Sequence, residues 1–189
     1  MRLKHQRGSM IIDLIIGVGI SLMMLAWLAN LAVGFNESRK ADRQGTRLAA
    51  GASALQSLLN KHGATIVSAG IVPGFANIYA PTAAELRAAS FLPTFVGTTL
   101  PFGGNMSFVV RKGANNDLLG IACGDTSIMQ RDQVAPHLAG LTVASVGGNG
   151  LRTSIAVPSQ LSGTAFQGIV SPVTGGAIVC AWAFLPNPT

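Results

Sequence analysis

The most prominent feature of the chain is an unbroken apolar run over residues 10–35. Its only ionisable residue is Asp13, and its other clearly polar positions are Ser21 and Asn30. At about 1.5 Å of rise per residue, a helix of this length crosses a bilayer core of roughly 30 Å. No later segment is comparably long and apolar, so the pattern predicts a single membrane-capable helix near the N-terminus.

The helical pattern continues beyond the apolar run. Apolar side chains recur at helical spacing at Leu48, Ala52, Leu55 and Leu59. The positions between them are polar and include Arg43, Gln44, Arg47 and Lys61. No proline precedes Pro73, so we expect one helix over residues 10–62, about 80 Å long, with Gly63 as its C-terminal cap. Because the second half is amphipathic, we expect a folded domain to pack against one of its faces.

After Gly63 the chain consists of short apolar runs separated by Gly, Pro and Asn. Several of these runs are predicted strands, over residues 106–111, 118–123, 151–157, 166–170 and 177–185. The turn AlaAsnAsnAsp at 114–117 indicates a hairpin between the first two. We therefore predict an α+β fold in which a small antiparallel sheet lies on the end of the long helix.

Two short helices are also predicted in this C-terminal part. Thr82 and Glu85 have the spacing of a capping box, which predicts a helix that ends near Ala89. Residues 127–138 are the second candidate, with Asp125 placed to cap the start of that helix.

The formal net charge is +6, and the basic residues are concentrated around the apolar run. Those in front of it are Arg2, Lys4 and Arg7, and without them ten basic residues stand against seven acidic ones, a balance of +3. Those behind it are Arg39, Lys40, Arg43 and Arg47, which are interleaved with Glu37 and Asp42 and indicate a solvated helix surface. No basic stripe with interleaved aromatic residues follows, so nucleic-acid binding is not expected. The basic N-terminus matches the rule for cytoplasmic flanks, which puts the rest of the chain outside.

The chain has two cysteines, Cys123 and Cys180, each in an apolar, strand-like segment. Their spacing is not that of a zinc or redox CxxC site. In an oxidising compartment a disulfide between them is the economical interpretation, and it would stabilise the fold by about 4 kcal/mol in the chain-entropy model. In a cytosolic domain the alternative would be two buried free thiols.

Residues 7–17 (ArgGlySerMetIleIleAspLeuIleIleGly) join a basic segment ending in glycine to an acid within the apolar helix. A carboxylate inside a membrane helix costs roughly 2.5–3.5 kcal/mol on insertion scales, so Asp13 is expected to pair with a partner. The alternative is that Asp13 lies at the cytoplasmic headgroup level and reaches water. Ordinary signal peptides carry no such acid, and they end in a small-x-small site that this run lacks. The combination resembles the type IV pilins and the related secretion pseudopilins.

In that family a dedicated peptidase cuts after the glycine on the cytoplasmic side and methylates the new amine. The resemblance implies cleavage between Gly8 and Ser9, which creates a free amine at Ser9, one helical turn from Asp13. It also implies that the Asp13 carboxylate pairs with the amine of a neighbouring subunit during assembly. The implied division of the chain is a leader at 1–8, a membrane and filament-core helix at 9–35, an amphipathic helix at 36–62 and a globular domain at 63–189.

Two residues differ from the common pilin pattern. Glu is usual where this chain has Asp13, and a large apolar residue is usual where it has Ser9; both differences favour a minor or divergent subunit. Further along, LeuProPheGlyGlyAsn at 100–105 resembles type IVb pilins, in particular the N-terminal domain of the tip-adhesin pilins of conjugative thin pili. Pilins also commonly close a C-terminal loop with a disulfide, a role open to Cys123 and Cys180.

Catalysis is not expected. His5, His62 and His137 have no Cys, Asp or Glu at ligand spacing, which argues against a metal site and against a Cys–His nucleophile. GlyGlyAsnGly at 147–150 follows a short apolar run and opens no helix, which argues against a phosphate site. The sequence thus predicts no catalytic residue, no metal and no cofactor.

Two functions remain. In the first, the chain is a type IV pilus subunit that starts in the inner membrane, with its N-terminus in the cytoplasm, and ends in an extracellular filament for adhesion or conjugation. Its partners are then other pilin subunits, the prepilin peptidase and a host or recipient cell surface. In the second, the chain is a monomeric, single-pass, membrane-tethered periplasmic binding module with an uncut N-terminus. We expect the first, and a tip subunit that acts as initiator or adhesin is intermediate between them.

Overall fold

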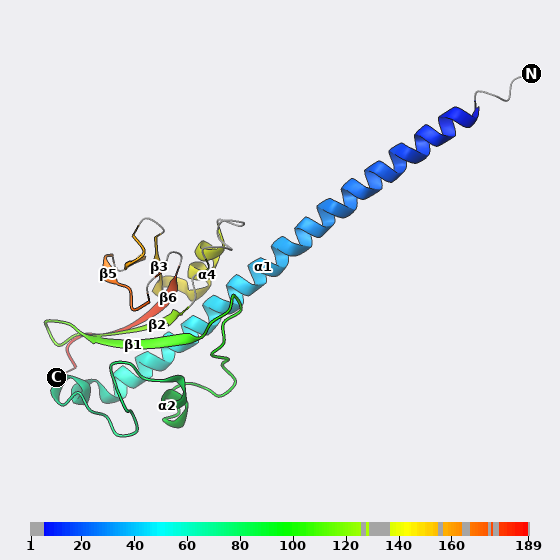
Figure 1. Cartoon of the computed structure of the whole chain (residues 1–189). Helices are drawn as coiled ribbons and strands as arrows, with labels where there is room; N and C mark the ends of the chain where they lie inside the picture. The colour runs from blue at the N-terminus through cyan, green and yellow to red at the C-terminus, as the bar shows by residue number, and fades with distance from the viewer. Residues whose placement is uncertain are drawn as a thin grey trace, which may run out of the picture. The chain divides into compact units, whose positions relative to one another are not determined.

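The computed structural model describes residues 6–125, 128, 137–154, 157–163, 167–173, 175 and 178–188, and for residues 6–13 it describes the backbone alone. The chain forms two compact units, Met1–Glu37 and Ser38–Thr189. Helix α1 (Gln6–Ser68) contributes its first part to the first unit and its second part to the second. In the second unit this helix packs on a six-stranded antiparallel sheet, which confirms the predicted α+β fold (Figure 1).

Helix α1 ends at Ser68, beyond the predicted end at residue 62, so the prediction that Gly63 is the C-terminal cap was wrong. A Cβ at Gly63 would lie 2.5 Å from a methyl carbon of Leu185 and 3.0 Å from Pro188, so glycine serves close packing there. The chain turns after the helix at Gly70, whose φ of 66° favours glycine. The amide of Gly70 donates to the carbonyl of Ile66 at 3.1 Å.

The sheet has the strand order β1-β2-β6-β3-β4-β5, and every neighbouring pair is antiparallel. The strands are β1 (Met106–Lys112), β2 (Leu118–Gly124), β3 (Gly150–Thr153), β4 (Gln160–Gly163), β5 (Ile169–Val170) and β6 (Val179–Leu185). The predicted hairpin is confirmed, because Lys112 of β1 pairs with Leu118 of β2 across the turn. The last strand, β6, lies between β2 and β3, so the C-terminal segment connects the β1-β2 hairpin with strands β3, β4 and β5.

Strands β3, β4 and β5 differ most from the sequence predictions. β3 and β5 are shorter than the predicted runs 151–157 and 166–170, of which residues 155, 156 and 166 lie outside the described part of the chain. β4 was not predicted. Its one buried side chain is Leu161, and a short strand with a single inward side chain shows no alternating pattern.

The predicted capping box is confirmed at α2 (Ala83–Ala88). The hydroxyl oxygen of Thr82 accepts a hydrogen bond from the Glu85 amide at 3.2 Å, and the Glu85 carboxylate accepts one from the Thr82 amide at 2.7 Å. These reciprocal bonds satisfy amides that the first turn of a helix leaves without partners.

A helix that the sequence patterns did not predict, α4 (Leu138–Val146), is followed by the 3₁₀ turn η1 (Gly147–Asn149). Residues 138–146 are almost all apolar, so they do not show the helical alternation of polar and apolar positions from which a helix is predicted. The helix packs on α1, since Ser145 of α4 lies against Gly45. The predicted helix at 127–138 falls largely outside the described residues, and Leu138 opens α4.

Helix α1 approaches the sheet closely because small residues face it at the centre. Gly120 of β2 pairs with Ala183 of β6, and Ala122 pairs with Ala181. A Cβ at Gly120 would lie 3.0 Å from the Cβ of Leu55 on α1. Along this face the helix buries the larger side chains Leu48, Leu55, Leu58, Leu59 and Ile66. At roughly 1.5–3 kcal/mol for each fully buried apolar side chain, this face is a principal source of stability for the second unit.

Candidate functional site

The apolar part of α1 in the first unit is exposed along its described length. Every described side chain over residues 14–36 is exposed. The exposed fractions include 78% for Met23, 64% for Trp27 and 68% for Phe35. By length and composition, this is the one helix among the described residues that could cross a membrane. A continuous apolar surface of this kind marks a site that contacts lipid or other protein.

The polar group of Ser21 within this stretch is satisfied by the helix itself. Its hydroxyl donates to the carbonyl of Gly17 at 2.8 Å. A hydroxyl bonded in this way can enter an apolar environment without losing its hydrogen bond. Gly17 and Gly19 have open space where a Cβ would lie, so no contact with the described part of the chain requires glycine at either position.

The predicted processing and assembly residues Gly8, Ser9 and Asp13 lie in the first turns of α1. Their side chains fall outside the described part of the structure. Cleavage after Gly8 and pairing of the Asp13 carboxylate therefore remain predictions.

Two glutamines and one arginine of α1 bind loops and strands of the second unit, and the sequence did not reveal these roles. The carboxamide oxygen of Gln44 accepts a hydrogen bond from the Phe102 amide at 3.3 Å, and that of Gln56 accepts one from the Phe184 amide at 3.1 Å. Gln44 was assigned to the polar positions of the helix, yet it is only 2% exposed, because its carboxamide faces a loop amide.

Arg47 acts in a similar way, since its guanidinium donates to the carbonyl of Thr99. An added Cβ at Gly97 would lie 3.3 Å from the Arg47 guanidinium carbon, so the arginine rests against this loop. Such long-range pairs leave no periodic signal, because each partner is separated from α1 by many residues in the sequence.

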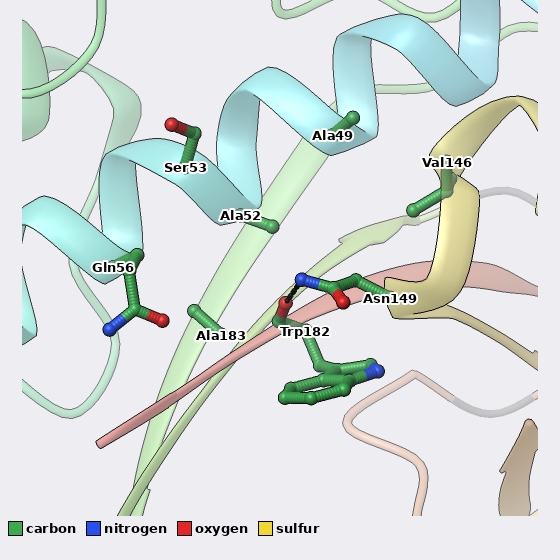
Figure 2. Close-up of a pocket in the computed structure, with 8 residues that line it drawn as sticks. All are labelled: Ala49, Ala52, Ser53, Gln56, Val146, Asn149, Trp182 and Ala183. Carbon is green, nitrogen blue, oxygen red and sulfur yellow. Dashed lines mark hydrogen bonds between the residues drawn. The ribbon is translucent and has the colours of Figure 1, made fainter. Parts of the chain in front are cut away.

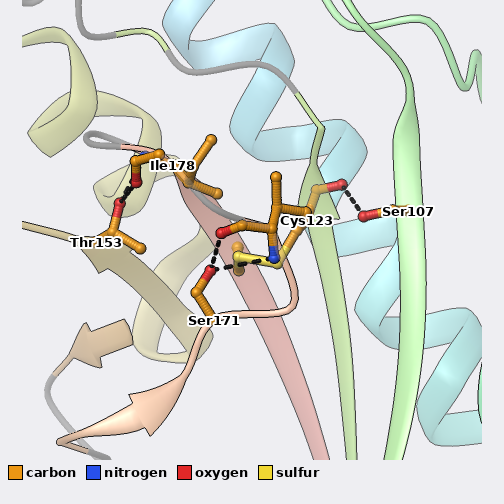
Figure 3. Close-up of a disulfide and its surroundings, with 8 residues drawn as sticks. Ser107, Cys123, Thr153, Ser171 and Ile178 are labelled. Carbon is orange, nitrogen blue, oxygen red and sulfur yellow. Dashed lines mark hydrogen bonds between the residues drawn. A yellow bond between two sulfur atoms is a disulfide. The ribbon is translucent and has the colours of Figure 1, made fainter. Parts of the chain in front are cut away.

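Cys123 and Cys180 form a disulfide with no exposed surface, and they are the pair named from the sequence (Figure 3). They are directly opposite each other on β2 and β6, with Cα atoms 4.1 Å apart. The Ser107 hydroxyl of β1 donates to the carbonyl of Cys123 at 3.3 Å. The disulfide belongs to a second apolar cluster on the opposite face of the sheet from α1, which contains Ile121, Cys123, Leu151, Leu161, Ile178 and Cys180.

The described hydrogen bonds of Asp125 connect it to Asn105, just before β1, and its predicted role as a helix cap stays a prediction. Its carboxylate accepts a hydrogen bond from the amide of Asn105 at 2.6 Å, and its own amide donates to the carbonyl of Asn105 at 3.0 Å. The residues that Asp125 was expected to cap, 126 and 127, lie outside the described part. His137 is exposed and precedes α4 as its N-cap residue.

A half-open groove of about 220 Å³ lies between α1, the end of α4 and β6 (Figure 2). Its lining residues are Ala49, Ala52, Ser53, Gln56, Val146, Asn149, Trp182 and Ala183, none of which is acidic or basic. The Asn149 amide nitrogen donates to the carbonyl of Trp182 at 3.2 Å across its floor. Within the described residues, no three His, Cys, Asp or Glu side chains form a group that could hold a metal ion.

A comparison with known protein families, curated proteins and solved structures found no match to the chain. The long apolar N-terminal helix, the antiparallel sheet on which α1 packs and the buried disulfide are together consistent with a pilin-like architecture.

Proposed function

We propose that the chain is a type IV pilus subunit that prepilin peptidase cleaves after Gly8. The apolar part of α1 then holds the subunit in the inner membrane and later packs in the core of an extracellular filament. The observation that carries this proposal is the division of α1 into an apolar part that is exposed and a part that is buried in a disulfide-closed domain. One helix can serve both lipid and filament, because each offers apolar surroundings.

Asp13 has a defined role in this proposal. Its carboxylate is the only ionisable group in the apolar run, and cleavage creates an amine at Ser9, one helical turn away. Pairing with the amine of a neighbouring subunit offsets the cost of burying the charge. Since only one axial offset between two helices brings carboxylate and amine together, the pair also selects the register of assembly.

We further propose a minor subunit of the type IVb kind that acts at or near the filament tip. Asp13 and Ser9 both differ from the residues that are common in major pilins, which supports a specialised role. Adhesion or conjugation would then depend on exposed loops of the second unit, such as residues 71–81, where Ile71 is 74% exposed.

The assembly step is tested by the substitution Asp13→Ala in a host that assembles the filament. We expect normal membrane insertion and about a tenfold loss of incorporation, because the neighbour's amine would lose a partner worth about 1–3 kcal/mol. Asp13→Glu is the matched control, since it keeps the charge and should incorporate normally. Normal incorporation of Asp13→Ala would sink the pairing role and favour a membrane-tethered module.

A further inference from the structure

Two arginines lie on the exposed side of α1 where the second unit begins. Arg39 and Arg43 are both exposed, whereas Ala41, Gln44 and Leu48 are buried in the second unit. At 3.6 residues per turn, Arg39 and Arg43 fall on the same face of the helix, opposite the buried one. Two like charges at this spacing repel each other, so an anion that contacts both would be attracted.

The neighbouring charged residues are placed differently. The guanidinium of Arg47, one turn further along, is bound to the carbonyl of Thr99. Glu37 and Lys40 also make interactions of their own. Asp42 is exposed and lowers the net charge of the segment, but basic residues still outnumber acidic ones over residues 37–47.

The position of Arg39 and Arg43 along α1 matches the level of lipid headgroups. Arg39 is one helical turn beyond Phe35, the last residue of the apolar run, which corresponds to about 6 Å. The headgroup region extends roughly 5–7 Å beyond each side of the hydrocarbon core. The Cα–Cβ bonds of a helix tilt toward its N-terminus, so long side chains at these positions can reach back toward the apolar run.

We infer that Arg39 and Arg43 bind the phosphate groups of anionic phospholipids while the subunit resides in the membrane. The inference rests on the membrane-anchored stage of the proposed function. Guanidinium groups bind phosphate through paired hydrogen bonds, and a basic segment beside a membrane helix is attracted to anionic headgroups. Assembly into a filament would have to break these contacts, so they favour the membrane-bound subunit over the assembled one.

The test uses the full chain in nanodiscs made of equal parts phosphatidylglycerol and phosphatidylcholine. After transfer to a mild detergent, native mass spectrometry counts the lipids of each kind that stay bound. We expect the unmodified chain to retain phosphatidylglycerol in preference. In the variant R39Q/R43Q, the ratio of retained phosphatidylglycerol to phosphatidylcholine should fall at low salt by about fivefold for each arginine removed. R111Q/R152Q, which removes the same charge from the sheet, is the matched control and should keep the preference.

Equal retention of the two lipids by the unmodified chain would overturn the inference, and so would an unchanged preference in R39Q/R43Q. An equal loss in both double variants would also overturn it, because the preference would then follow net charge alone. A chain that does not enter nanodiscs would overturn this inference together with the membrane anchor. By contrast, an uncut N-terminus in a processing host would contradict the pilin pathway and leave the lipid result standing.

Discussion

Gly45 of α1 and Ser145 of α4 are in such close contact that no side chain fits between them. A Cβ at Gly45 would come within 1.8 Å of the Ser145 hydroxyl oxygen and 2.5 Å of the Thr142 carbonyl oxygen. The Ser145 side chain can rotate away, but the carbonyl belongs to the backbone of α4. A larger residue at position 45 would therefore push the two helices apart.

The substitution Gly45→Ala should destabilise the second unit by about 1–3 kcal/mol, the usual cost of overpacking. The gain of about 1 kcal/mol that alanine brings to a helix interior offsets part of this loss, and because one of the close atoms belongs to the backbone of α4, we expect the net effect to be destabilising. Thermal unfolding of the full chain in detergent should show a melting temperature lower by several degrees.

Gly140→Ala is the matched control for that substitution. Gly140 lies in α4 with open space where its Cβ would be, so alanine should leave the stability unchanged or raise it by up to about 1 kcal/mol. Equal melting temperatures for Gly45→Ala and Gly140→Ala would contradict the close contact between α1 and α4.

The disulfide should contribute a large part of the stability of the second unit. Cys123 and Cys180 are separated by 57 positions, and closing a loop of that length stabilises a fold by about 4 kcal/mol in the chain-entropy model. The double variant Cys123→Ala/Cys180→Ala should lose about this much in denaturant unfolding. Adding a reductant should weaken the unmodified chain and leave the double variant unaffected; a reductant effect on both would argue against this assignment.

The hydrogen bonds of Glu85 should make the stability of the second unit depend on pH. The amide of Ala76 donates to its carboxylate at 2.6 Å, and the amide and hydroxyl of Thr82 each donate at 2.7 Å. These bonds, that of Ala76 first, hold the pKa of Glu85 below its ordinary value of 4.5. Because the folded state favours the charged form, the stabilisation is fully present above pH 4.5 and is lost as the pH falls through the lowered pKa.

The amide protons of Ala76 and Thr82 report this titration directly in an NMR experiment. Their shifts should move together, with a midpoint below pH 4.5. In Glu85→Gln the movement should disappear, and the stability difference from the unmodified chain should shrink in acid. A midpoint above 4.5, or one that persists in Glu85→Gln, would assign the titration to another group.

Local patterns were sufficient for the elements that depend on neighbours in sequence. The absence of proline predicted the long helix, the spacing of Thr82 and Glu85 predicted α2, and the turn at 114–117 predicted the hairpin. The features that were missed depend on distant partners. Gly63 lies inside the helix where Leu185 leaves no room for a side chain, and the buried carboxamide of Gln44 meets the Phe102 amide.

The features of the candidate site also fall into those that local sequence predicts and those that depend on distant partners. The basic N-terminal segment, the acid at position 13 and the apolar run are continuous in sequence, so they could be recognised without a structure. The strand order that places Cys123 opposite Cys180 could not, because β6 pairs with β2 across many intervening residues. By contrast, the solvated position of Arg39 and Arg43 was predicted from the charge pattern, and the structure adds that the opposite face of α1 is buried.

The measurement that tests the central claim most directly is the intact mass and N-terminal sequence of the protein. It should be purified from membranes of a host that expresses the cognate prepilin peptidase. The proposed pathway predicts a chain that begins at Ser9, with or without an added methyl group. A chain that still begins at Met1 in a host that processes other prepilins would contradict it and favour the membrane-tethered module.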